Sequence, residues 1–270
     1  YGSIVDEKTC FRLYDIFSDC GGNHIDTAHL YVGGESERML GKWLKQHGRD
    51  DIFVATKGAH PPIDNMNASR LTKREIQKDL EESLCRLGID CIDLYWLHRD
   101  NAAANPGEVI EILNEFIKAG KIKMIGCSNW RASRIAEANA YAKKHGLEGF
   151  SASQIKWSLA KTCDSYSDDP TLVEMNGTEY AYYSETKLPI AAFASQGKGF
   201  FSKLYTGGES ALSQKAKDRY LCSENLKRFE KIKNLTEKYQ TSPGAIVLSY
   251  LSSMTDVTAM PIIGCKNENQ

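Results

Sequence analysis

Strand and helix patterns alternate along almost the whole chain. The expected strands read NHIDTA, IFVATK, CIDLYWLH, KMIGCSN, SASQIKW, PIAAFAS and VTAMPIIG. Helical patterns cover residues 8–20, 35–46, 72–87, 107–119, 131–144, roughly 170–183, and 224–251 with a break at Pro243. Because strict alternation gives parallel strands joined by right-handed crossovers, the sheet is expected to be either a closed barrel or an open doubly wound sheet.

The chain length and the absence of a nucleotide fingerprint favour the barrel. The sequence has 270 residues, close to the ~250 typical of a (β/α)8 barrel. No GxGxxG motif follows the first strand, as an open dinucleotide-binding sheet would require. We predict an α/β fold, a (β/α)8 TIM barrel, as one domain over residues 1–270. Its first strand and last helix are expected to be missing from this sequence. The longest expected loops, 58–70 and 198–222, are placed to cover a site.

Composition argues against several kinds of partner. The chain carries 34 basic and 35 acidic side chains, a formal net charge of −1, so neither nucleic acid nor a membrane surface is expected. No apolar run approaches the ~18 residues of a spanning helix, and a cytoplasmic protein is expected. The eight cysteines form no CxxC pair or metal-ligand spacing, so we expect reduced thiols and no metal. The oligomeric state is not readable from the sequence.

Four ionisable side chains lie at or just beyond the expected carboxyl ends of the first three strands. Asp26 lies in NHIDTA and Tyr31 just beyond it. Lys57 ends IFVATK, and His98 ends CIDLYWLH. Taken singly, they have structural explanations: a loop cap, a surface aromatic, a solvated strand terminus and a packed histidine. Because a barrel gathers these strand ends at one rim, their joint occurrence favours a catalytic site.

Together these residue types suit the protonation of an oxygen atom. A phenol is a weak acid at neutral pH, and a nearby ammonium group makes it a better one by stabilising the phenolate. We expect Asp26 to hold Lys57 charged, so that Lys57 tunes the acidity of Tyr31. Tyr31 is then the general acid, and His98 orients the carbonyl group that receives the proton.

Such a site needs a hydride donor, and without metal-ligand spacing we expect an organic cofactor. Asn129 and Gln154 offer the donor and acceptor that recognise a carboxamide. Phe193 is placed to stack on a nicotinamide ring, and the Gly197 turn, unless it is an ordinary flexible turn, lets backbone N–H groups approach a pyrophosphate. Lys266 suits a ribose 2′-phosphate and so favours NADPH over NADH; the alternative is a solvated surface lysine.

Five motifs, in order and at suitable spacing, resemble those of the aldo-keto reductase superfamily of NADPH-dependent (β/α)8-barrel oxidoreductases. They span nearly the whole chain and read NHIDTAHLYVGGESERMLGKWL, DIFVATK, SLCRLGIDCIDLYWLHR, GKIKMIGCSN and AFASQGKGFFS. The resemblance implies reduction of an aldehyde or ketone by a tetrad of Asp26, Tyr31, Lys57 and His98. It also implies the residues that bind the cofactor. Its carboxamide is bound by Ser128, Asn129 and Gln154, and its nicotinamide ring stacks on Phe193. Its pyrophosphate is bound by Ala194, Ser195, Gln196 and Gly197, and its adenosine by Gly264, Lys266 and Gln270.

One segment departs from the family's pattern. The family often reads Tyr-Ser-Pro-Leu-Gly where this chain has FASQG at 193–197. The stacking position usually filled by tyrosine or tryptophan is therefore taken by Phe193.

Two other functions are compatible with the sequence. A nicotinamide-binding sensor or subunit with vestigial catalysis would need neither Tyr31 nor His98. A barrel isomerase or lyase with Lys57 as Schiff-base nucleophile would need that lysine without an acid partner, which Asp26 opposes. Within the reductase hypothesis, substrate choice is expected to come from the two long loops and from Trp130 or Trp157, whose alternative role is core packing.

Overall fold

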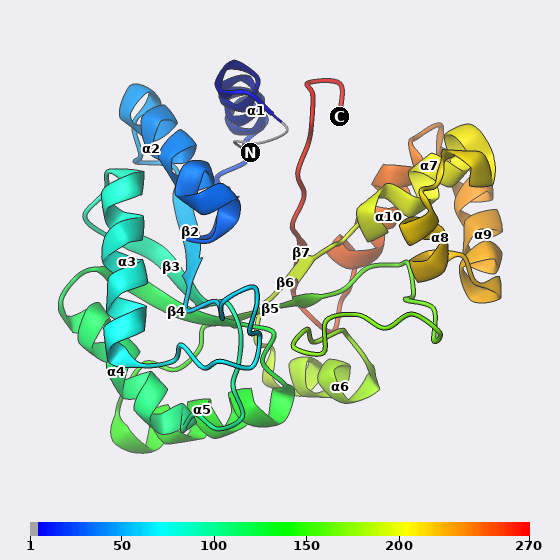
Figure 1. Ribbon diagram of the computed structural model, residues 1–270. Coiled ribbons are helices and arrows are strands. Elements are labelled where there is room, and N and C mark those ends of the chain that lie inside the picture. The colour runs from blue at the N-terminus through cyan, green and yellow to red at the C-terminus, as the bar shows by residue number, and fades with distance from the viewer. Residues whose placement is uncertain (1–4) are drawn as a thin grey trace. The chain divides into compact units, whose positions relative to one another are not determined.

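Parallel strands and helices alternate through residues 5–270, the part of the chain described by the computed structural model (Figure 1). This repeat confirms the predicted α/β fold class of the (β/α)8 barrel. The chain divides into two units. The first unit ends at Ala152 and also includes Gly264–Gln270, and the second unit is Ser153–Ile263. The single domain over residues 1–270 stays a prediction.

The described part of the first unit contains four parallel strands paired in sequence order. They are β1 (His24–Asp26), β2 (Phe53–Gly58), β3 (Ile92–Leu97) and β4 (Ile122–Ser128). Every residue of β3 is buried, as expected for a strand covered on both faces. Because the strands are parallel, their carboxyl ends lie at one edge.

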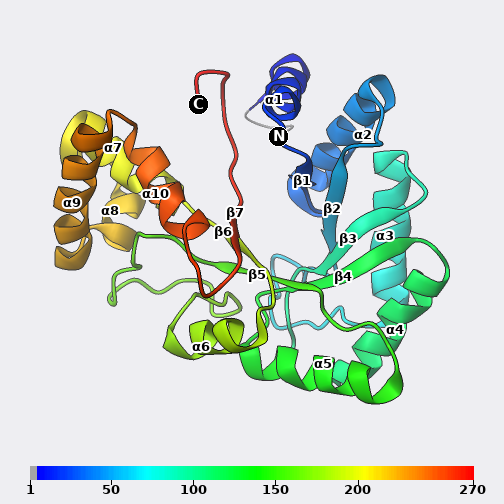
Figure 2. The ribbon, with the colours of Figure 1, turned by 180° about the vertical axis from the view of Figure 1, so that it is seen from behind.

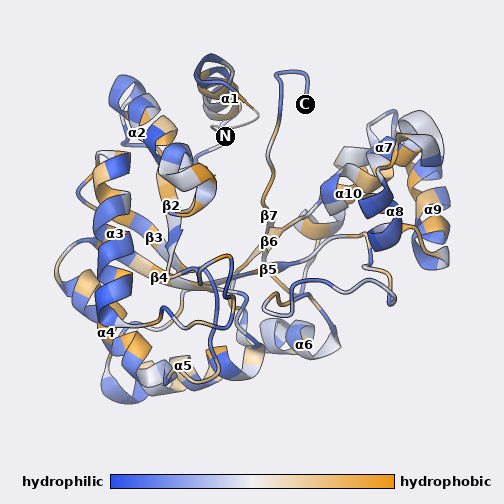
Figure 3. Cartoon of the chain, in the orientation of Figure 1, coloured by the Kyte–Doolittle hydropathy of each residue, from blue (hydrophilic) through white to orange (hydrophobic). Residues whose placement is uncertain are grey.

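The helices of the first unit lie where they were predicted: the first precedes β1, and each of the other four follows a strand. They are α1 (Glu7–Asp19), α2 (Glu35–His47), α3 (Lys73–Leu87), α4 (Pro106–Lys118) and α5 (Ala132–His145). Figures 1 and 2 show α2, α3 and α4 along one side of the strands. In Figure 3 the outer surface of α3 is mainly hydrophilic, which fits a helix that buries only its strand-facing side.

Residues at the ends of α3 and α4 explain where these helices begin and end. The Thr72 hydroxyl accepts a hydrogen bond from the Glu75 N–H, which caps the start of α3, and it donates to the Glu75 carboxylate. Gly88 ends α3 at φ +65°, and Gly120 follows α4 at φ +70°. Both glycines take the left-handed conformation that ends a helix at little steric cost.

The second unit contains three parallel strands and five helices among its described residues. The strands are β5 (Ala152–Lys156, whose first residue belongs to the first unit), β6 (Ile190–Phe193) and β7 (Ala259–Pro261). The helices are α6 (Gly177–Thr186), α7 (Phe200–Gly207), α8 (Gln214–Tyr220), α9 (Ser223–Tyr239) and α10 (Pro243–Ser252). Helices α7 to α10 enclose a separate apolar core that includes Phe200, Phe201 and Ile232.

Two expectations for this unit are wrong. The segment 198–222, expected to be a loop, contains α7 and α8. The helix expected from about residue 170 begins only at Gly177, because the preceding residues return to β5: the Lys156 N–H donates to Val173 O, and the Met175 N–H donates to Lys156 O, both at 2.9 Å. The predicted break at Pro243 is confirmed, since α10 begins there.

Candidate active site

The strands of the first unit bring Asp26, Lys57 and His98 to one edge. Asp26 is the last residue of β1, and Lys57 lies one residue before the end of β2. His98 directly follows β3, and its backbone N–H donates to the carbonyl oxygen of Gly58 at 2.9 Å. The parallel register therefore explains why residues far apart in sequence lie together.

Lys57 is the centre of the cluster. Its side chain is fully buried, and its Nζ donates to the Asp26 carboxylate and, at 2.7 Å, to the backbone oxygen of Thr27. Burial acts to lower the pKa of Lys57, but the charge of Asp26 and the interaction with Tyr31 outweigh it and raise that pKa above its usual value. Lys57 is therefore a cation at neutral pH.

Tyr31 lies beside this cation. It begins a short 3₁₀ helix, Tyr31–Gly34, and its backbone N–H donates to Ala28 O at 3.0 Å. The centre of its ring is 4.9 Å from Lys57 Nζ, and the tyrosine helps to raise the pKa of Lys57. With 41% of its surface exposed, Tyr31 can contact both the buried ammonium group and a molecule from solution.

His98 completes the group as a neutral imidazole. Its ring meets the Tyr31 ring edge-on, with centres 5.9 Å apart. Burial, together with the positive charge of Lys57, holds the pKa of His98 well below its usual value. A neutral imidazole has one N–H donor, which suits it to hydrogen-bond an uncharged oxygen. The structure thus brings together all four residues of the predicted tetrad, while their roles stay predictions.

The analysis of the sequence missed His60. Its ring lies edge-on to His98, with centres 4.7 Å apart, and its Nδ1 is 2.6 Å from Pro61 O. The available signal was its position three residues after Lys57, still at the carboxyl end of β2. His60 belongs to the wall of this site.

A buried ion pair holds the turn between Lys57 and His60. Asp79 accepts two hydrogen bonds from Arg70, at 2.9 and 2.7 Å, and one from the Ala59 N–H at 2.8 Å. Ala59 has φ +58°, an unfavourable conformation for a residue with a Cβ. The Asp79 contact compensates for this strain, and Arg70 also donates to His60 O at 3.1 Å.

Ser128 and Asn129 lie at the end of β4, and both are buried. Asn129 has φ +60°, and its amide nitrogen donates to Ser128 Oγ at 3.1 Å and to His98 O at 3.4 Å. These bonds connect Ser128 and Asn129, two of the three residues predicted to bind the carboxamide, to the backbone of His98. The three predicted adenosine residues form a separate exposed turn of this unit, in which the Lys266 N–H donates to Gln270 Oε1 at 2.8 Å.

The remaining predicted cofactor residues belong to the second unit. Gln154 is buried in β5, and Phe193 ends β6. In the following turn, Ser195 Oγ donates to Ile262 O at 2.6 Å, and Ala194, Gly197 and Lys198 all have φ between +52° and +55°. A Cβ at Gly197 would lie 2.7 Å from the Cβ of Ala160, so only glycine fits there.

Lys198 adds positive charge to this turn, next to the beginning of α7. Burial and the nearby cations Arg219 and Lys215 lower the pKa of Lys198. Positive charge beside a helix N-terminus attracts an anion such as a phosphate group. The analysis of the sequence passed over Lys198 because a surface lysine gives no distinctive pattern.

The expected role of the tryptophans in a substrate pocket is not supported by their exposure. Trp130 is fully buried and packs against Phe150, with ring centres 5.0 Å apart. Trp157 is 5% exposed and lies between Tyr180 and Tyr250. Both act as packing residues, the alternative that the sequence left open.

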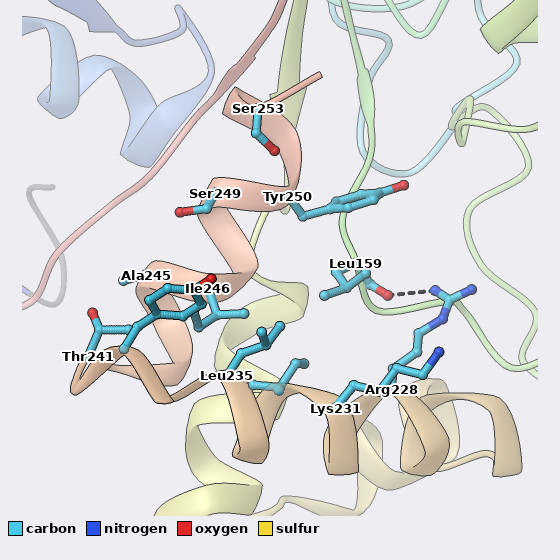
Figure 4. Close-up of a pocket in the computed structure, with 12 residues that line it drawn as sticks. Leu159, Arg228, Lys231, Leu235, Thr241, Ala245, Ile246, Ser249, Tyr250 and Ser253 are labelled. Carbon is cyan, nitrogen blue, oxygen red and sulfur yellow. Dashed lines mark hydrogen bonds between the residues drawn. The ribbon is translucent and has the colours of Figure 1, made fainter. Parts of the chain in front are cut away.

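A cavity of about 640 Å³ lies between α9 and α10 in the second unit (Figure 4). Its wall is mostly apolar, with Leu235, Ile246 and Tyr250 among the lining residues. None of the predicted site residues is among those that line it.

No group of three or more His, Cys, Asp or Glu side chains within residues 5–270 is arranged to hold a metal ion. None of the described helices combines the length and apolar character that a membrane crossing requires.

Comparison with known proteins places the chain in a family. The model of the aldo/keto reductase family matches residues 2–270. Norsolorinic acid reductase stcV of Emericella nidulans is 30% identical over 280 residues, which cover 98% of this chain and 67% of that protein. Aldo-keto reductase yakc [NADP(+)] of Schizosaccharomyces pombe is 30% identical over 92% of this chain and 72% of its own length.

A third relative matches a shorter part of the chain. A norsolorinic acid reductase of Aspergillus flavus is 34% identical over 162 residues, 57% of this chain. The match spans about two fifths of that protein, 42% of its length. The motifs, the parallel β/α repeat and the match to residues 2–270 lead to one conclusion: the chain belongs to the aldo/keto reductase family, a family of oxidoreductases.

Proposed function

We propose that this chain reduces an aldehyde or ketone to an alcohol with NADPH, and that Tyr31 is the general acid. The observation that carries the proposal is the position of the Tyr31 ring 4.9 Å from the ammonium nitrogen of Lys57, which is itself paired with Asp26. A phenol beside a permanent cation, with a neutral imidazole next to it, is arranged to give up a proton.

Each of the four residues has a separate task. Tyr31 donates its hydroxyl proton to the carbonyl oxygen as that oxygen becomes an alkoxide. The Lys57 ammonium group stabilises the phenolate that remains, and Asp26 keeps Lys57 charged and fixed in position. His98 donates a hydrogen bond to the same oxygen and so orients the carbonyl group.

The residues present fit a phosphate-bearing nicotinamide cofactor. In the second unit, the cations around Lys198 and the closely packed Gly197 turn provide a backbone and a charge that suit a pyrophosphate. We propose carboxamide contacts from Ser128, Asn129 and Gln154, stacking by Phe193, pyrophosphate contacts from residues 194–197, and adenosine contacts from Gly264, Lys266 and Gln270. When bound, NADPH supplies the hydride that adds to the carbonyl carbon.

The preference for NADPH over NADH rests on Lys266 and on a relative. An ammonium group that contacts a 2′-phosphate contributes about 1.5 to 3 kcal/mol. The printed name of the Schizosaccharomyces pombe relative includes NADP(+). Exchange of Lys266 for methionine should therefore weaken NADPH binding and leave NADH binding unchanged.

The proposal is tested with a panel of aldehydes and ketones and with both cofactors, following the loss of cofactor absorbance. We expect turnover with NADPH and at least one carbonyl compound, and a large loss of turnover in Tyr31→Phe. Tyr239→Phe, an exposed tyrosine on α9, is the matched control and should keep full activity. Tight NADPH binding without any turnover would instead support a cofactor-binding sensor, and equal turnover in Tyr31→Phe would reject the acid role.

A further inference from the structure

The second unit holds two cysteines together at the junction of α8 and α9. Cys163 belongs to the connection after β5, and Cys222 is the residue directly before α9. The Cys163 N–H donates to Arg219 O at 2.8 Å, and the Cys222 N–H donates to Tyr220 O at 3.0 Å. Both cysteines are thus tied to the same short stretch of backbone, the end of α8.

Asn225 joins the segment around Lys161 to the end of α8 and the start of α9. It is fully buried; its amide oxygen accepts from the Lys161 N–H at 3.0 Å, and its amide nitrogen donates to Lys161 O at 2.8 Å and to Tyr220 O at 2.7 Å. Arg228 adds a bond to Leu159 O at 2.6 Å, drawn as the dashed line in Figure 4. Several hydrogen bonds therefore hold the segment 159–163 against the start of α9.

The side chains of the two cysteines meet across this contact. Between these backbone contacts the two side chains are neighbours, since the Cys222 thiol raises the pKa of the Cys163 thiol. Both are free thiols; Cys163 is 8% exposed, and Cys222 is more accessible. Two interacting thiols on segments that backbone contacts hold side by side are candidates for a disulfide.

We propose that Cys163 and Cys222 form a redox modification site, which a hydroperoxide converts to an intramolecular disulfide. This inference is independent of the proposed reductase activity. From the sequence, these two cysteines were expected only to be reduced thiols.

The different exposure of the two thiols sets the order of the steps. Cys222 Sγ, the more accessible sulfur, attacks hydrogen peroxide; the O–O bond breaks, water leaves, and Cys222 becomes a sulfenic acid. Cys163 Sγ then attacks the Cys222 sulfur; the S–O bond breaks, and a second water leaves with the remaining thiol proton. In total, two thiols lose two electrons and two protons, and one peroxide is reduced to two waters.

The surroundings of Cys163 agree with its place as the second sulfur. Burial first, and then the interaction with the Cys222 thiol, raise the pKa of the Cys163 thiol to about 11. Cys163 is therefore protonated at neutral pH and reacts only once an electrophilic sulfur stands next to it.

The test uses the full chain, treated with hydrogen peroxide, then alkylated and digested with trypsin without reduction. We expect a disulfide that links peptide 162–187 to peptide 220–227, more abundant than any other disulfide, and lost on reduction with dithiothreitol. If Cys163 and Cys222 are recovered unlinked while the exposed Cys20 and Cys85 are oxidised, or if Cys222 links elsewhere, the proposal is overturned.

Variants separate the two sulfurs. In Cys163→Ser the link should disappear, and dimedone should label Cys222 as the sulfenic acid. In Cys222→Ser, Cys163 should stay a thiol. Cys20→Ser, a change at an exposed cysteine of the first unit, is the matched control and should form the 163–222 link as the unmodified sequence does. Dimedone labelling of Cys163 in Cys222→Ser would contradict the assigned order.

Discussion

The ammonium nitrogen of Lys57 lies 4.9 Å from the centre of the Tyr31 ring. The same nitrogen donates to Asp26 and to Thr27 O and is closed off from solvent. A buried cation held by one carboxylate acts on one phenol, so the proposed chemistry depends on this pairing. Substitutions at the residues that pair with Lys57 should therefore change stability or activity measurably.

Replacement of Asp26 by asparagine should destabilise the chain. Removing one charge from a buried pair leaves the other uncompensated, so we expect the free energy of unfolding to fall by about 3 kcal/mol. The loss should appear in urea unfolding at neutral pH. Asp164→Asn, which alters a carboxylate that is 88% exposed, is the control and should change stability by less than about 0.5 kcal/mol. Equal stability of the two variants would disprove the tight coupling of Asp26 to Lys57.

Buried, neutral His98 should make the chain sensitive to acid. Its folded pKa is well below the 6.5 of an unperturbed histidine, so the unfolded state binds more protons as the pH falls. The stability present above pH 6.5 is therefore lost progressively as the pH falls below it towards the folded pKa. Unfolding measured at neutral pH and near pH 5 should show a smaller acid loss in His98→Gln. The exposed His145 is the control site. Between neutral pH and pH near 5, His145→Gln should lose as much stability as the unmodified protein.

Asp79 should be needed for the turn that carries His60. The variant Asp79→Asn leaves Arg70 without its two-bond partner, and it weakens the support of the strained Ala59. We expect a loss of about 3 to 5 kcal/mol in unfolding free energy. Glu81→Gln, at an exposed carboxylate of the same helix that pairs with Lys121, should cost less than about 1 kcal/mol. A loss at Asp79 no larger than at Glu81 would contradict this role.

Two glycines of the second unit separate steric clash from backbone strain. Gly197 and Gly199 both have positive φ, but an added Cβ would lie 2.7 Å from the Ala160 Cβ at Gly197 and no closer than 3.8 Å to any neighbour at Gly199. Gly199 is left-handed, with φ +74° and ψ +24°, and Gly199→Ala should cost about 1 to 2 kcal/mol, the penalty of that conformation. Gly197→Ala should cost about 1 to 3 kcal/mol more, and it should weaken NADPH binding in fluorescence titration. Unchanged NADPH affinity in Gly197→Ala would argue against the proposed pyrophosphate contact.

The sequence predicted the strands and the tetrad because both depend on local signals. Buried parallel strands are short apolar runs, and all seven were found at their observed positions within residues 5–270. Since parallel strands end at a common edge, the sequence alone assigns the residues after each run to one place. Asp26, Lys57 and His98 lie where that reasoning put them.

The errors occurred where contacts distant in sequence decide the structure. The segment before α6 is extended because Glu174 and its neighbours pair with Lys156 of β5, which no local pattern reveals. Asn176 caps α6 through its bonds to the next residues, and with Glu179 it gave a boundary signal that was overlooked. Helices α7 and α8 are short, with eight and seven residues. Their apolar side chains are buried only by packing against α9 and α10, which the local sequence does not reveal. The contact between Cys163 and Cys222 likewise needs the folded chain.

The central claim is most directly tested by a double-mutant cycle of Tyr31→Phe and Lys57→Met, with the rate of carbonyl reduction measured at saturating NADPH. If Lys57 acts through the Tyr31 phenol, Tyr31→Phe should slow the reaction by roughly 10²- to 10⁴-fold, and adding Lys57→Met should slow it little further. Losses that multiply in the double variant would show that the two side chains act independently, and would contradict the account.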